Sequence, residues 1–481
     1  MVASFLLNLA FLNSLLLVNS NKTFLLISLL YLIILIRKTQ NYRLSLLLLF
    51  INLLPLTIGR NLLDVTLIAQ KEIFSFAIYD VKYFLPIYLS DLFLLLIYQN
   101  YFSKKFFSSV LNKTIGSPLS HKNRITYSIL LCFFLLILLR SVSHEFAPLL
   151  LAGSLIILKY ILIFGLPFLI QLNKLRNYKE LLAAITAMTV FHSVTVIYEQ
   201  IKGGNLGLFI ENRLPGLELG TRAAEAGDML RADGIFNEPN ITATFLLMNL
   251  TLMLDLGLKN LTKKITANRL YFGISGLAIL AITFTGSRSL YFLTSIVLIY
   301  YLALYRQTLW PQLRQLLRKK LMLLITTTVV LLTSPYLLSR MQSLSNVFSR
   351  DGSLSYRSEL NSHVLSMSFS NYLGIGLDLT PYYLAKNFKT VDSPLVIFDQ
   401  APAHNIIVQL LAETGIIATV IFISFVYITI KHGYQGKHRT FALAAIVYFL
   451  AAQFHPVFTN HYQLTGFFFL YLGVANFYDQ K

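Results

Sequence analysis

Residues 404–430 read HNIIVQLLAETGIIATVIFISFVYITI, and this stretch decides the fold. From position 405 onward it holds one charged residue, Glu413. Apolar runs of roughly 15–20 residues cross a bilayer as helices, because the hydrocarbon layer offers no water to satisfy backbone hydrogen bonds. The stretch therefore predicts a transmembrane helix over 405–430, with a histidine and an asparagine at its entrance.

Apolar runs of this kind recur along the whole chain. Of its 481 residues, 56% are hydrophobic and only 13% are charged. This composition leaves no room for a sizeable water-soluble domain, so we expect residues 1–481 to form a single transmembrane domain. The one cysteine, Cys132, lies inside an apolar run, which excludes an intramolecular disulfide and a thiolate metal cluster.

The apolar runs between charged breaks predict an all-α integral membrane protein, a polytopic bundle of about 12–14 helices. The predicted spans are 2–18, 23–36, 44–58, 81–98, 125–139, 149–171, 181–199, 241–257, 270–286, 290–305, 321–338, 405–430, 440–458 and 463–478.

The formal charge of +19 has two possible readings, a nucleic-acid partner or the positive-inside bias of a membrane protein. Position decides for the membrane, because the Lys and Arg residues gather in alternate loops. These loops are 37–43, 104–124, 174–179, 259–269, 306–320 and 431–439. We expect them, and both termini, in the cytoplasm, and we expect no nucleic-acid partner.

The loops on the opposite side differ in kind. Two of them, 200–240 and 339–404, are long, and their basic residues are matched by carboxylates. Loops longer than about 15 residues in a tight architecture are usually functional or disordered, and these two are not of low complexity. We therefore expect the functional site on this outer face.

Two arginines stand where polar sequence meets a helix. Arg231 opens the segment RADGIFNEPN, whose Pro239-Asn240 suits a helix entrance, so a simple turn and cap is one reading. The other reading is a phosphate site, because a guanidinium lies beside free helix amides. Arg288, in FTGSRS at 284–289, interrupts apolar sequence, and it either snorkels to the interface or meets water, an acid or an anion.

Two further candidates lie in and after the second long loop. Arg357, in SYRSE at 355–359, either pairs with Glu359 on a surface helix or serves function, and a Gly-Ile-Gly follows at 374–376. His404 would lie at the outer mouth of the bundle. It is either a cap or a base, since imidazole titrates near neutrality and can accept the proton of an attacking hydroxyl. Glu413 would orient a neighbour or pair with an arginine.

These four pieces, in this order, resemble the O-antigen ligase and O-antigen polymerase family of bacterial membrane proteins over about residues 231–420. The residues that carry the resemblance are Arg231, Gly234, Pro239, Asn240, Ser287, Arg288, Arg357, Gly374, Gly376, His404, Asn405 and Gly415. Ala418 departs from the pattern, because the family often has a glycine or a polar residue there. This departure favours a polymerase slightly over a ligase.

The resemblance implies a C-type glycosyltransferase architecture in the bacterial inner membrane, with its active site facing the periplasm. The donor would be an undecaprenyl-diphosphate-linked glycan, transferred without a metal ion or another cofactor. By the same resemblance, Arg231, Arg288 and Arg357 would bind the diphosphate, and His404 would be the catalytic base. The supporting residues would be Asn240, Asn405 and Glu413. The acceptor would be another lipid-linked glycan in a polymerase, or lipid A-core in a ligase.

Two alternatives stay open at this point. A lipid-linked oligosaccharide flippase or another transporter fits the number of spans, although transporters commonly have repeats and a midplane site, whereas polarity here gathers in the outer loops. A metal-dependent transferase is suggested by Asp64 and Glu72, but magnesium needs converging oxygen ligands that a sequence alone does not reveal.

Overall fold

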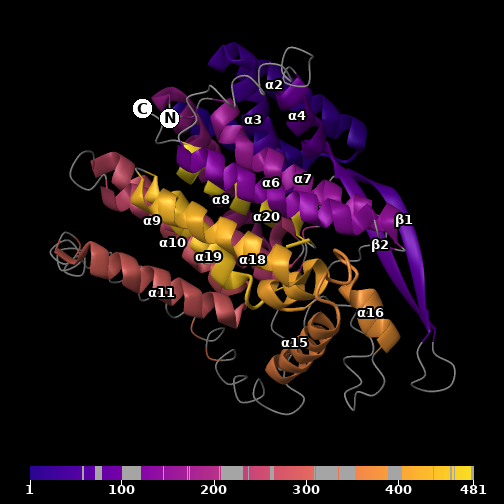
Figure 1. The fold of residues 1–481 in the computed structure, drawn as a ribbon. Helices are drawn as coiled ribbons and strands as arrows, with labels where there is room; N and C mark the ends of the chain where they lie inside the picture. The colour runs from indigo at the N-terminus through magenta and orange to yellow at the C-terminus, as the bar shows by residue number, and fades with distance from the viewer. Residues whose placement is uncertain are drawn as a thin grey trace.

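The computed structural model describes residues 1–56, 59–70, 78–99, 121–206, 231–259, 265–309, 353–387 and 403–477, apart from a few positions within these ranges, together with residues 334 and 338. The described helices form a bundle in which long helices run side by side (Figure 1). Five of them are long and apolar enough to cross a membrane. These are α6 (His121–Val142), α7 (Ala147–Leu169), α8 (Leu175–Lys202), α9 (Pro239–Lys259) and α18 (Ile406–Gln435).

The other bundle helices are shorter or less uniformly apolar. They are α1 (Val2–Ser14), α2 (Asn21–Thr39), α3 (Tyr42–Leu53), α4 (Leu89–Tyr98), α10 (Ile265–Phe284), α11 (Arg288–Leu304), α19 (Arg439–Ala451) and α20 (Tyr462–Phe477). The prediction of a polytopic helical membrane protein is confirmed. The predicted span 321–338 lies outside the described residues, except for two positions.

Helix α9 lies at the centre of the bundle. Of its apolar window, 94% is buried inside the protein, against 28% for α6, and α9 packs against α8, α10 and α19. Helix α6 instead exposes Leu131, Leu135 and Leu139, as expected of a helix that faces lipid. The polar segment before α9 therefore lies in the middle of one end of the bundle.

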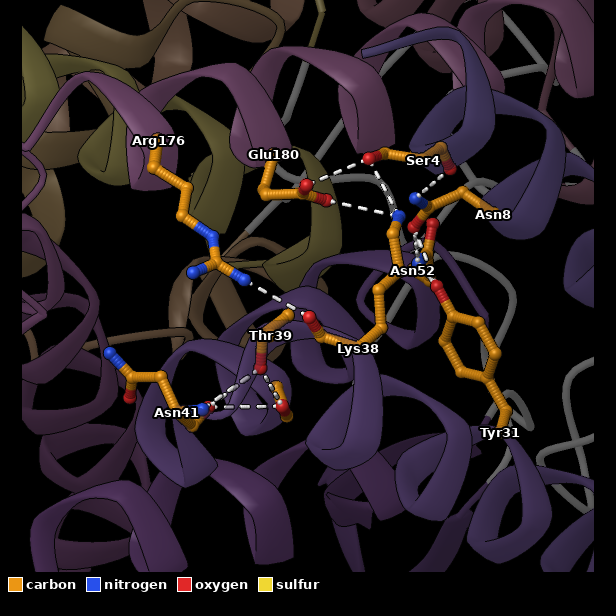
Figure 2. A network of polar contacts seen from close by, with 10 residues as sticks. Ser4, Asn8, Tyr31, Lys38, Thr39, Asn41, Asn52, Arg176 and Glu180 are labelled. Carbon is orange, nitrogen blue, oxygen red and sulfur yellow. Dashed lines mark hydrogen bonds and ion pairs between the residues drawn. The ribbon is translucent and has the colours of Figure 1, made fainter.

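Polar side chains join the N-terminal helices to one another and to α8 (Figure 2). Between α1, α2 and α3, Tyr31 Oη and Asn52 Nδ2 both donate to Asn8 Oδ1, at 2.6 and 2.7 Å. Lys38 of α2 contacts Glu180 of α8 at 3.5 Å. Interhelical hydrogen bonds of this kind hold helices together where lipid provides no hydrophobic driving force between them.

One predicted span is wrong. The first part of the predicted helix 81–98, residues 81–88, belongs to strand β2 (Ile78–Tyr88). This strand pairs antiparallel with β1 (Gly59–Gln70), from Gly59 opposite Tyr88 to Gln70 opposite Ile78. Pro86 explains the difference, because proline lacks the N–H that a helix interior needs. The hairpin lies beside α16 (Thr380–Asn387) (Figure 1). Asp64 lies on β1, and Glu72 lies outside the described residues.

The second predicted long loop contains two helices. Helices α15 (Ser353–Ser370) and α16 both lie within 339–404, and both contact α18 near its start (Figure 1). Residues 388–402 of this loop and 207–230 of the first loop lie outside the described residues. The two helices place parts of the second loop directly against the bundle.

A buried ion pair inside the bundle leads to a prediction about stability. Lys159 Nζ lies 2.6 Å from Asp91 Oδ2, and Tyr462 Oη donates to Asp91 Oδ1 at 2.8 Å. We expect Asp91→Asn to lower the stability by about 3–5 kcal/mol, because it leaves the ammonium of Lys159 buried without its carboxylate. Thermal unfolding of the purified protein in detergent measures this loss. The double variant Asp91→Asn/Lys159→Met should regain most of it, and equal losses in both variants would contradict the explanation.

Candidate functional site

Arg231 lies against the C-terminal end of α10. Its Nε donates to the carbonyl oxygen of Thr285 at 3.1 Å, and the backbone N–H of Ala232 donates to that of Phe284, also at 3.1 Å. The last carbonyl groups of a helix lack partners within the helix, so they are available as acceptors. Arg231 Nη2 donates to Asn240 Oδ1 at 3.0 Å. These two acceptors are an uncharged carbonyl oxygen and an uncharged amide oxygen.

The first turn of α9 holds Arg231 in this position. Pro239 is the first residue of α9, as the sequence predicts, but the side chain of Asn240 bonds to Arg231 and to Glu238 rather than capping the helix. Glu238 Oε1 accepts from Asn240 Nδ2 at 2.8 Å and from the backbone N–H of Asn240 at 3.3 Å. Glu238 therefore fixes the amide that orients the guanidinium.

A second carboxylate anchors the same segment. Glu199, a buried residue of α8, accepts from the backbone N–H of Gly234 at 2.7 Å. Gly234 has a φ of 60°, and a Cβ there would lie 3.1 Å from the side chains of Val196 and Thr242. The glycine thus lets the chain turn tightly against α8 and α9 before it enters the centre of the bundle.

Arg288 is the first residue of α11 and is half-buried. It lies three residues after Thr285, whose carbonyl oxygen accepts the hydrogen bond from Arg231. The two arginines, which come from different segments, therefore both lie next to the turn between α10 and α11. The next residue, Ser289, bonds through Oγ to Nε2 of His455 at 3.0 Å. The predicted interruption between the spans 270–286 and 290–305 is therefore a turn that contacts another loop.

The third and fourth motifs meet at the start of α18. Asn405 caps this helix, with Oδ1 accepting from the N–H groups of Ile407 and Val408 at 2.9 and 3.1 Å. The cap fixes the preceding residue, His404, which is half-buried. Arg357 of α15 donates from Nη1 to the carbonyl oxygen of Phe454 at 3.3 Å. Burial, with the added effect of the Arg357 charge, lowers the pKa of His404 to about 3.

The two glycines at 374 and 376 have a structural role, because they lie in a segment that packs against the interruption of α18. Helix α18 is interrupted at Gly415, and the segment that carries the two glycines crosses it there. The N–H groups of Ile375 and Gly376 donate to the carbonyl oxygens of Ala412 and Glu413, at 2.8 and 3.0 Å. Backbone therefore packs directly on backbone, which supports the turn of α18 that follows His404.

Glu413 orients neutral neighbours. It is buried, and its Oε1 accepts from Thr380 Oγ1 at 2.9 Å and from Gln409 Nε2 at 3.4 Å. Gln409 also donates to Thr459, whose hydroxyl lies 3.3 Å from Asp378 Oδ1. Burial raises the pKa of Asp378 to about 6. Of the two roles considered for Glu413, these contacts match the orienting one.

His455 is the residue that sequence reasoning missed. It lies in the turn between α19 and α20 and is 2% exposed. Burial is the main cause that lowers its pKa well below the usual value, and the remaining causes are the charges of Arg357, His404, Arg231 and His461. The predicted span 440–458 hid His455, because α19 already ends at Ala451. The available signal was the pair of histidines 455 and 461 on the two sides of the predicted end of this span at 458.

The structure thus joins three of the motifs at the turn that holds His455, because Arg357 bonds to the carbonyl oxygen of Phe454, Ser289 bonds to His455, and the N–H of Ile406, two residues after His404, bonds to the carbonyl oxygen of Ala452. The charge of Arg231 also acts on His455, and Arg288, the first residue of α11, precedes Ser289. Cations and neutral imidazoles at the ends of helices are suited to binding an anion and to accepting a proton. Among the residues that the structure describes, no group of three or more His, Cys, Asp or Glu side chains is arranged to hold a metal ion.

Comparison with known proteins adds one result to this geometry. Residues 273–423 match the model of a family described as O-antigen ligase. No curated protein matches the chain. The matched region contains Arg288, Arg357 and His404, while Arg231 precedes it and His455 follows it. Residues 273–423 of this polytopic membrane protein are therefore similar to the O-antigen ligase family.

Proposed function

We propose that the protein is a glycosyltransferase that transfers or polymerises an undecaprenyl-diphosphate-linked glycan on the periplasmic face of the bacterial inner membrane. One observation carries the proposal. The motifs meet at the segment between α19 and α20, where Arg357 bonds to the carbonyl oxygen of Phe454, Ser289, next to Arg288, bonds to His455, and the N–H of Ile406, two residues after His404, bonds to the carbonyl oxygen of Ala452. Glu238, whose carboxylate fixes the amide that holds Arg231, lies 3.9 Å from His461 of the same segment. The family match to O-antigen ligase over 273–423 supports the same reaction class.

The arginines fit the leaving group of this reaction. As the glycosidic bond breaks, negative charge grows on the diphosphate, and fixed cations that stabilise this charge lower the barrier. Arginine supplies such a charge without titrating and can bind phosphate through two N–H groups. Arg288 also stands at the first turn of α11, where free backbone amides favour an anion.

His404 fits the role of the base. The acceptor hydroxyl oxygen forms a bond to the anomeric carbon of the donor sugar, the bond from that carbon to the diphosphate oxygen breaks, and the hydroxyl proton passes to the imidazole. A pKa of about 3 keeps His404 unprotonated at neutral pH. An anionic donor in the site offsets the charge of Arg357, so it raises the proton affinity of His404 when the base is needed.

The proposed orientation in the membrane is supported by basic residues at the end of the bundle opposite the site. Arg176 and Lys38 come from different basic loops and are adjacent, since Arg176 Nη2 donates to the carbonyl oxygen of Lys38 at 3.0 Å (Figure 2). The charge of Arg439 acts on Tyr305 at the end of α11 that lies away from Arg288. Lysine and arginine at membrane-helix ends favour the cytoplasm. The site end then faces the periplasm.

Arg288→Ala tests the proposal. We expect the rate of glycan transfer in membrane vesicles to fall about 10²–10³-fold, the usual effect of removing one group that stabilises the transition-state charge. Arg306→Ala, at the exposed opposite end of the same helix region, is the matched control and should keep the wild-type rate. A wild-type rate in Arg288→Ala would contradict the role of this arginine. Loss of lipid-linked glycan translocation, with transfer intact, would favour a flippase.

Analysis of the surface glycans of a strain that lacks this protein would identify the acceptor. A polymerase extends another lipid-linked glycan, so its loss should leave single repeats attached at the cell surface without longer chains. A ligase delivers glycan to lipid A-core, so its loss should remove all attached repeats while lipid-linked chains accumulate. The buried Ala418 in α18 favours the polymerase, because it departs from the ligase-like ending.

A further inference from the structure

The segment between α19 and α20 contacts all four motifs of the site. Its described residues are 452–455, 458, 459 and 461, and all of them lie beyond the family match at 273–423. The contacts are Ile406 N–H to Ala452 O at 2.9 Å, Arg357 Nη1 to Phe454 O at 3.3 Å, Ser289 Oγ to His455 Nε2 at 3.0 Å, and Glu238 Oε2 to His461 Nε2 at 3.9 Å. This segment is therefore the common support of the four motifs.

His455 is the member of this segment whose side chain contacts the motif around Arg288. Charged or titratable groups from four elements act on it electrostatically: Arg357 from α15, His404 from the start of α18, Arg231 from the segment before α9, and His461 from the start of α20. Of these, Arg357 bonds to the carbonyl oxygen of the preceding residue, Phe454. Burial and these charges lower its pKa, so the ring is neutral at physiological pH. A neutral imidazole has one nitrogen that donates and one that accepts, and Nε2 is committed to Ser289.

Ser289 connects His455 to the arginine next to it. Its Oγ lies 3.0 Å from the imidazole and 3.5 Å from Ser287 Oγ, so the hydroxyl groups on both sides of Arg288 lie in one short chain of polar contacts. Burying an imidazole among cations costs free energy, and an apolar side chain would avoid that cost. The bond to Ser289 is the contact that an apolar residue would lose.

We propose that His455 is a positioning residue of the site, which acts through Ser289 to fix the first turn of α11 and thus the direction in which Arg288 meets the diphosphate of the donor. This inference rests on the proposed function, since it assigns the positioned arginine to the diphosphate. It also extends the site beyond the four motifs and beyond the matched region.

Binding of undecaprenyl diphosphate to the purified full-length protein in lipid nanodiscs tests the inference. We expect His455→Ala and Ser289→Ala each to weaken binding about tenfold, the equivalent of one lost hydrogen bond to a group that orients a charge. The affinity of the double variant should equal that of the single variant with the larger loss, because each of the two replacements already removes the contact between Ser289 and His455. His455→Gln should keep most of the affinity, because its amide can still bond to Ser289.

Two matched controls accompany these variants. Ser295→Ala removes an exposed hydroxyl from the same helix, and His432→Ala removes a half-buried histidine near the far end of α18, so both should bind as the wild type does. Thermal unfolding of each variant separates lost binding from lost folding, and Ser289→Ala provides a mild variant if His455→Ala unfolds.

The outcomes separate this inference from the proposed function. Wild-type affinity in Ser289→Ala and His455→Ala, with weakened binding in Arg288→Ala, would overturn the positioning role and leave the proposed function standing. Losses that multiply in the double variant would also overturn it. Wild-type affinity in Arg231→Ala, Arg288→Ala and Arg357→Ala would instead remove the proposed diphosphate site itself.

Discussion

Replacing His404 with alanine should lower the rate of glycan transfer about 10²–10⁴-fold, the contribution expected of a general base. The loss should lie in the chemical step, because the arginines that are proposed to bind the diphosphate stay in place. Binding of undecaprenyl diphosphate should therefore change little, while single-turnover transfer slows. The half-buried His432, near the opposite end of α18, offers a control whose replacement by alanine should leave the rate unchanged.

The pH dependence of the wild-type enzyme provides a second measurement of the same role. Because the pKa of His404 is lowered to about 3 in the free protein, its base form is present throughout the range from pH 5 to 8. The kcat/KM for transfer should show no acid limb near pH 6.5 that comes from His404. An acid limb at that pH that disappears in His404→Gln would show that the imidazole titrates normally, and the buried environment described for it would be wrong.

Replacing Gly415 with alanine should destroy most of the folded protein. Gly415 has a φ of 81° and a ψ of 169°, a conformation that is essentially restricted to glycine. A Cβ there would lie 2.4 Å from the carbonyl oxygen of Tyr372, and a Cβ on Gly374 would lie 2.5 Å from that of Glu413. Backbone atoms cannot move aside as a flexible side chain can. We expect a loss of more than about 3 kcal/mol from strain and clash together.

Two glycines of α10 make a matched control for this experiment. A Cβ on Gly273 or Gly276 meets no atom within 4 Å, so alanine fits at both positions. Each replacement should be neutral or should stabilise the helix by up to about 1 kcal/mol. The measurement is the yield and thermal midpoint of detergent-purified protein. A wild-type midpoint in Gly415→Ala would show that α18 does not need its interruption.

The spans were predictable because each depends on local sequence. The run from Ile406 to Ile430 has the length and apolarity of a membrane helix, whatever the rest of the chain does. The strand at 78–88 was not recognised, because its apolar residues resemble a short helix and only Pro86 argues against one. Hydrophobicity alone does not separate these two structures over so short a stretch.

The site was predictable only in part, because its contacts join distant segments. Arg231 and His404 stand out in the sequence, since each marks a polar entrance to an apolar helix. The partners of Asn240 were not foreseeable, because a local reading assigns it to a cap and the structure uses it to hold Arg231. His455 was missed because its importance comes from four neighbours that lie far away along the chain.

The four motifs all contact the segment between α19 and α20, through Ala452, Phe454, His455 and His461, so they cannot be exchanged independently of this segment. A hybrid that takes only residues 273–423 from a homologue would inherit three motifs and keep the recipient's own Arg231 segment and α19–α20 turn. The transplanted serine and arginine would then face foreign partners at the exchange borders. Chimeras designed to swap acceptor preference should therefore carry the donor protein's chain from the segment before α9 through the start of α20.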